Sequence, residues 1–158
     1  EQIAKLEKDI TMVESKVKQI PKPETKHFDT LLKQENIILG LISLQAGNPD
    51  QALVYLQDIL KQKDQTPLKA QILMALGNGF LARGHATQAA YYYGIILREY
   101  SKSSHVPSAL YYLGKAMEEL AENEKQKVLW NELIKNHPNS HLAKRAKKRL
   151  SGSGPISD

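Results

Sequence analysis

Apolar residues recur at every third or fourth position along most of the chain, which is the spacing of amphipathic α-helices. Glycine, proline and polar runs divide this pattern, and the divisions at 47–50, 66–67 and 84–85 carry residues that end or begin helices. The pattern therefore predicts an all-α fold. The expected helices cover residues 1–20, 28–46, 50–63, 67–83, 87–100, 107–121, 123–136 and 140–150.

The same landmarks return along the chain at intervals of 37 residues. Leucine–glycine pairs stand at 39–40, 76–77 and 113–114. Three further positions recur at this interval: a turn position (Gly47, Gly84, Ala121), a small position (Ala52, Ala89, Gln126) and a large position (Leu56, Tyr93, Trp130). We therefore expect three helix–turn–helix units in register, because unrelated helices would not repeat four landmarks together.

The third unit is the most complete. Gly114 removes a side chain where two antiparallel helices approach closely, Trp130 is expected to fill the space between them, and Pro138 ends the second helix. These residues resemble the tetratricopeptide pattern, in which a Leu-Gly pair, aromatic residues and a proline recur in a helix–turn–helix unit. The resemblance implies a right-handed helical-repeat solenoid of three units plus a C-terminal capping helix over 140–150.

The N-terminal segment has a different pattern. Residues 1–20 carry a seam of apolar residues spaced three and four apart: Ile3, Leu6, Ile10, Val13, Val17 and Ile20. This seam predicts a coiled-coil-like helix that either forms a homo-oligomer or packs on the chain's own repeats. Residues 21–27, with Pro21 and Pro23, are expected to be a linker, 28–150 the repeat domain and 151–158 a flexible tail.

The junctions between units point to a sub-family. The stretch from Tyr100 to Gly114 and the stretch from His137 to Lys144 resemble the junctions of bacterial cell-envelope tetratricopeptide proteins, such as the Tol–Pal-associated cell-division coordinator and the outer-membrane assembly lipoprotein. Ser101 departs from the usual proline, and no lipid-attachment cysteine is readable. The resemblance implies a scaffold in the periplasm or envelope of a Gram-negative bacterium. The alternative is a cytoplasmic adaptor or regulatory subunit.

Composition adds few constraints. A hydrophobic content of 41% and a charged content of 25% are ordinary for a globular protein, there is no cysteine, and no apolar run is long enough to span a membrane. The net charge of +5 lies in one cluster, Lys144, Arg145, Lys147, Lys148 and Arg149, since the rest of the chain has 17 basic and 17 acidic residues. This basic patch is either the solvated face of a capping helix or a contact for an acidic partner. We expect no nucleic acid partner, because Tyr93 belongs to the core register.

Nothing in the sequence predicts catalysis. The five histidines are His27, His85, His105, His137 and His141, and only the last two have helical spacing, with Pro138 between them. Glycines near residue 77 sit within a helix rather than in a phosphate-binding loop. We therefore expect a non-enzymatic protein without a cofactor or metal ion.

The tetratricopeptide resemblance implies that the first helix of each unit lines a concave groove for a partner segment, helical or extended. By register, the groove residues are Gln34, Ile37, Leu41, Leu44, Gln71, Met74, Asn78, Leu81, Tyr111, Lys115 and Glu118. Ile37 and Leu41 stand where a carboxylate clamp would need Lys and Asn, so we expect a partner helix in the groove rather than an acidic C-terminal peptide. Alternatively, some of these residues pack against the chain's own N-terminal helix.

Overall fold

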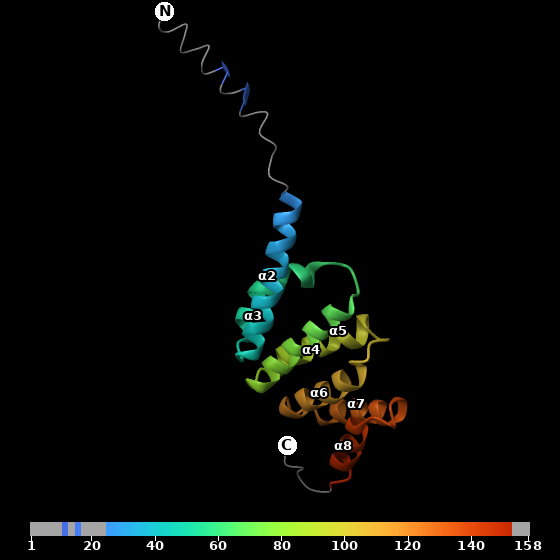
Figure 1. The fold of residues 1–158 in the computed structure, drawn as a ribbon. Helices are drawn as coiled ribbons and strands as arrows, with labels where there is room; N and C mark the ends of the chain where they lie inside the picture. The colour runs from blue at the N-terminus through green and yellow to red at the C-terminus, as the bar shows by residue number, and fades with distance from the viewer. Residues whose placement is uncertain (1–10, 13–14, 17–24, 153–158) are drawn as a thin grey trace, which may run out of the picture. The chain divides into compact units, whose positions relative to one another are not determined.

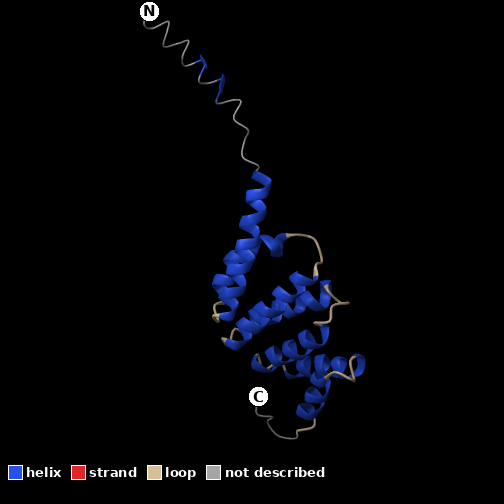
Figure 2. Cartoon of the chain, viewed as in Figure 1, coloured by secondary structure: helices blue, strands red, loops and turns tan. Residues whose placement is uncertain are grey.

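The computed structural model describes residues 11–12, 15–16 and 25–152, and in this part of the chain every regular element is a helix (Figure 2). The helices are α2 (Thr25–Gln45), α3 (Pro49–Lys61), α4 (Pro67–Ala82), α5 (Ala86–Glu99), α6 (Val106–Glu119), α7 (Asn123–Asn136) and α8 (His141–Leu150). The all-α prediction is confirmed, and from α3 onward the expected bounds agree with the observed ones within two residues.

The first repeat helix begins earlier than predicted. α2 starts at Thr25 rather than at residue 28, so residues 25–27 of the predicted linker are helical. The two prolines explain the difference, because Pro21 and Pro23 restrict only the residues around them and leave Thr25 free to enter a helix. Except for 11–12 and 15–16, which are helical, the predicted N-terminal helix and its apolar seam lie outside the described residues, as do tail residues 153–158.

The chain divides into two compact units, Glu1–Glu35 and Asn36–Asp158. Within the second unit each helix packs against the next, from α3 to α8, and α6 also contacts α4 and α8 (Figure 1). This order is that of helical hairpins stacked side by side, with the first helix of one hairpin against the first helix of the next. The second unit is therefore a tetratricopeptide-like helical repeat.

Each leucine–glycine pair has the role that the sequence predicts. A Cβ atom on Gly40, Gly77 or Gly114 would lie closer than 3.0 Å to the large residue of the partner helix, which is Leu56, Tyr93 or Trp130 respectively. These three large side chains are fully buried. The glycines thus let the two helices of a hairpin approach until the large side chain rests on bare backbone.

The turns inside the hairpins share one geometry. Gly47, Gly84 and Ala121 all have positive φ, at 74°, 73° and 59°. In each turn the following residue donates its N–H to a carbonyl five residues earlier, as Glu122 does to Met117 at 2.8 Å. This is the C-terminal motif that favours glycine, so Ala121 adopts it at a steric cost of about 1 kcal/mol.

α8 continues the register of the repeat. Ala146 and Leu150 lie 37 residues after Ala109 and Leu113 of α6, and both alanines are fully buried. Ser140 caps the helix by accepting a hydrogen bond from the Leu142 N–H at 3.2 Å. α8 is therefore the first helix of a further unit, and it covers the end of the third hairpin as the predicted capping helix should.

Candidate functional site

The predicted groove residues occupy four repeating positions on α2, α4 and α6. Gln34 belongs to the first compact unit, and the other ten belong to the second. In the second unit Gln71 and Asn78 are exposed, whereas six residues are half-buried: Ile37, Leu41, Leu44, Leu81, Lys115 and Glu118. Leu41, Leu44 and Leu81 pack against the core at their inner ends, so they present only part of their apolar surface to a partner.

Two of the predicted contact residues are not accessible. Met74 and Tyr111 retain 6% and 1% of their exposure, so the prediction that they line the groove is wrong. They occupy the same register position, and Met74 lies in the core cluster that also contains Ala109 of α6. Tyr111 accordingly joins the core cluster of Leu142, Ala143 and Ala146 on α8. The side chains at this position therefore belong to the core that joins neighbouring helices.

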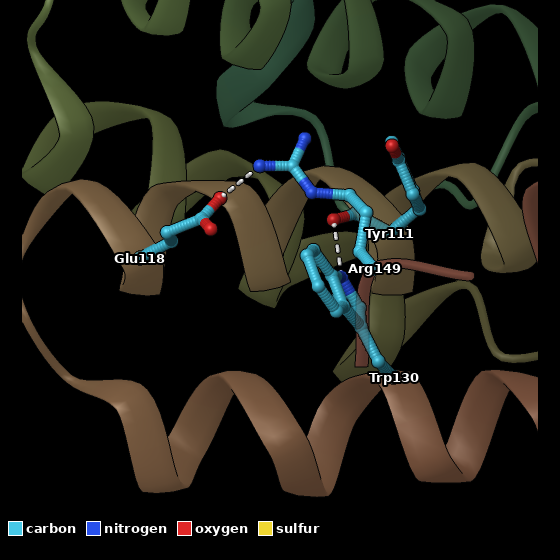
Figure 3. Close-up of polar contacts among 4 residues, drawn as sticks. All are labelled: Tyr111, Glu118, Trp130 and Arg149. Atoms are coloured by element: carbon cyan, nitrogen blue, oxygen red, sulfur yellow. Dashed lines mark hydrogen bonds and ion pairs between the residues drawn. The ribbon is translucent and has the colours of Figure 1, made fainter. Parts of the chain in front are cut away.

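Tyr111 also connects α6 with α7 and α8. Its ring stacks on Trp130 at 5.7 Å between centroids and 13° between planes, and the Arg145 guanidinium lies 5.5 Å from its centre on α8. The Trp130 indole N–H donates to the Tyr111 carbonyl at 3.0 Å (Figure 3). The Tyr111 hydroxyl is buried without a hydrogen-bond partner in the structure.

Glu118 is accessible but already paired. The Arg149 guanidinium on α8 donates to its carboxylate at 2.8 Å and lies 5.4 Å from the centre of the Trp130 ring (Figure 3). About a third of each charged side chain remains exposed, 33% for Arg149 and 39% for Glu118. The pair therefore holds α8 against α6, and a partner that binds Glu118 must compete with Arg149.

The predicted basic patch divides into two groups. Arg145 and Arg149 turn toward the aromatic rings of Tyr111 and Trp130, where their charge stabilises the docking of α8. Lys144, Lys147 and Lys148 are exposed on the outer side of the same helix. Lys147, Lys148 and Arg149 also occupy the last turn, where cations interact favourably with the helix dipole. Only the three lysines form an open cationic surface.

Asn78 is the groove residue with a fixed orientation. The Tyr93 hydroxyl donates to the Asn78 side-chain oxygen at 2.8 Å. Burial raises the pKa of Tyr93, and the neighbouring Tyr112 and Glu119 raise it further, so the phenol keeps the proton that it donates. Asn78 is exposed, and its amide also carries N–H donors that a partner could use. The sequence analysis missed this contact, because Tyr93 and Asn78 belong to different helices and nothing local links them.

The sequence analysis also missed a repeated exposed apolar position. Val54, Tyr91 and Val128 lie 37 residues apart on α3, α5 and α7, and they are 64%, 63% and 65% exposed. Extending the 37-residue register to every position of the second helix would have revealed them. They lie on the outer helices and not on the helices of the predicted groove.

Among the described residues, no three His, Cys, Asp or Glu side chains are arranged to hold a metal ion. In the same part of the chain, no helix combines the length and the apolar character needed to cross a membrane.

The tetratricopeptide repeat family model matches residues 108–140, which cover most of α6, all of α7 and the turn before α8. No curated protein matches the sequence. The match falls on the unit that also carries Gly114 and Trp130. Together with the stacked hairpins, it supports the interpretation of the chain as a tetratricopeptide-repeat protein. Such repeats are typical of scaffolds that bind other proteins.

Proposed function

We propose that the protein is a non-enzymatic scaffold that binds a segment of another protein along the first helices of its hairpins. The single observation that carries the proposal is the set of exposed and half-exposed residues Leu41, Leu44, Gln71, Asn78 and Leu81 on α2 and α4. Half-buried leucines offer apolar contact, while the exposed amides of Gln71 and Asn78 offer hydrogen bonds that fix a partner's orientation. Met74, Tyr111 and Glu118 are left out of this surface.

Asn78 makes this surface favour one kind of partner segment over another. Its side chain is exposed, and its amide carries N–H donors as well as the oxygen that accepts from Tyr93. The surface therefore suits a partner with a free carbonyl oxygen, as in an extended segment, more than the middle of a helix, whose carbonyls are already bonded.

The experiment is site-specific photo-crosslinking in the native cell. A benzophenone amino acid at position 71 should form adducts with one partner, and the added change Asn78→Asp should reduce them. The matched control places the benzophenone amino acid at Gln88, which is also an exposed glutamine and lies on α5. Equal adducts at both positions, or none at position 71, would contradict the proposal.

We further propose that the scaffold works in the envelope of a Gram-negative bacterium. The support is the resemblance of the junctions around residues 100–114 and 137–144 to those of envelope tetratricopeptide proteins. Fractionation of native cells should recover the protein with periplasmic or membrane-associated material. Recovery in the cytoplasmic fraction would favour the adaptor alternative instead.

A second partner chemistry has its own support. Lys144, Lys147 and Lys148 are exposed on α8 and are free to meet an acidic protein. Replacement of all three by glutamine should then weaken binding of such a partner and remove its salt dependence. The fold should tolerate the change, because the docked side chains Arg145 and Arg149 remain.

A further inference from the structure

An open hollow of ≈ 430 Å³ lies between α6 and α7. Its walls are Leu113 and Met117 from α6 and Val128 and Leu129 from α7, with Glu124 and Lys125 beside them. On α6 these wall residues lie on the face opposite Lys115 and Glu118, since each residue advances by about 100° around the helix. The hollow is therefore separate from the surface proposed above.

The second hairpin fills the equivalent place with its own aromatic rings. By the 37-residue register, Phe80, Tyr91 and Tyr92 stand where the third hairpin has Met117, Val128 and Leu129. Phe80 and Tyr92 stack at 5.6 Å with 6° between their planes, and Tyr91 meets Tyr92 edge-on at 5.2 Å. The hollow is thus the place where one hairpin lacks the aromatic cluster of its neighbour.

The chemistry of the walls matches a ring better than an aliphatic chain. The Met117 thioether makes favourable contacts with aromatic rings, particularly at the ring edge. Lys125 stands at the rim, 3.2 Å from Glu122, where its ammonium group complements the negative face of an aromatic ring. Val128 remains 65% exposed, so nothing in the described structure covers the site.

We propose that this hollow binds an aromatic side chain of a partner protein, which takes the place that Phe80 and Tyr92 occupy in the second hairpin. The inference goes beyond the proposed groove and does not depend on it, because the two surfaces share no residue. An aromatic anchor in a small apolar pocket is a common centre of protein–protein contacts.

The test uses the full chain and two small probes, N-acetyl-phenylalanine amide and its leucine counterpart, with NMR detection of side-chain methyl groups. We expect the phenylalanine probe to shift the methyl signals of Leu113, Met117 and Leu129 saturably, with ring-current signs, at concentrations where the leucine probe shifts them much less. Equal shifts from both probes, or shifts that do not saturate, overturn the proposal.

Two variants locate the binding site. Val128→Asp places a charge at the rim and should abolish the shifts, whereas Val54→Asp, at the same register position and 64% exposed, should leave them unchanged. Met117→Phe with Leu129→Tyr rebuilds the ring pair of the second hairpin and should also abolish them, now by filling the hollow. Unchanged binding in Val128→Asp, or equal loss in Val54→Asp, refutes the site whether or not the filled variant folds.

Discussion

Replacing Trp130 by alanine tests the hairpin register directly. Trp130 is 1% exposed, stacks on Tyr111, donates to the Tyr111 carbonyl and rests on the bare backbone of Gly114. The Arg149 guanidinium lies 5.4 Å from the centre of its ring. The change removes the largest buried side chain of the third hairpin, and a buried tryptophan replaced by alanine costs roughly 3–5 kcal/mol through lost transfer energy and the cavity left behind.

That cost is a large part of a typical domain stability of about 5–15 kcal/mol, so the variant should unfold at a clearly lower urea concentration. Trp130→Phe keeps a ring beside Tyr111 and loses the indole N–H, so it should cost less, about 1–2 kcal/mol. Far-UV circular dichroism is the appropriate signal, because Trp130 is the only tryptophan and its fluorescence vanishes in the variants.

The matched control is Val128→Ala, on the same helix but 65% exposed, which should stay within about 0.5 kcal/mol of the wild type. The register would be refuted if Trp130→Ala cost less than about 1 kcal/mol, or no more than this control.

Four shorter predictions concern other parts of the chain. Gly77→Leu should cost at least roughly 1–3 kcal/mol in a urea melt, because a side chain there meets the Tyr93 ring; wild-type stability would contradict the close approach. Ala121→Gly should raise stability by about 0.5–1 kcal/mol in the same assay, since glycine adopts positive φ without steric cost, and a loss would argue against the turn geometry. Glu118→Gln should cost only about 0.2–1 kcal/mol, and less in high salt, because its pair with Arg149 is partly exposed. Deletion of residues 1–20 should convert an oligomer into a monomer in sedimentation experiments; a full-length monomer at high micromolar concentration would eliminate the coiled-coil hypothesis.

The repeating contacts were predictable from the sequence because each is set by residues at a fixed interval. Gly77 against Tyr93 and Gly114 against Trp130 need only the register to be recognised. The positive φ of Ala121 follows in the same way, from its alignment with Gly47 and Gly84. In these cases the local pattern and the tertiary packing agree, so the pattern is sufficient to predict the contact.

The candidate surface was less predictable, because exposure depends on what the next element covers. Tyr111 has the register position of a groove residue, but α8 packs over it, and the sequence alone does not show which face of α8 docks there. The Arg149–Glu118 pair joins residues 31 positions apart, and rotamers and distances decide whether it forms. The Tyr93–Asn78 contact is of the same kind, since it depends on how deeply a phenol reaches between two helices.

Because α8 has the register of the first helix of a hairpin, a further hairpin would stack on its open face. In α6 Leu110 and Tyr111 join the core cluster that includes α8, whereas α8 itself has Lys147 and Lys148 at the equivalent positions. A further apolar helix would have to strip water from these two lysines in order to stack there, and it would offer no compensating partner for them. Lys147 and Lys148 therefore oppose the stacking of another hairpin on α8. Head-to-tail association of this protein through α8 is disfavoured while these two lysines remain charged.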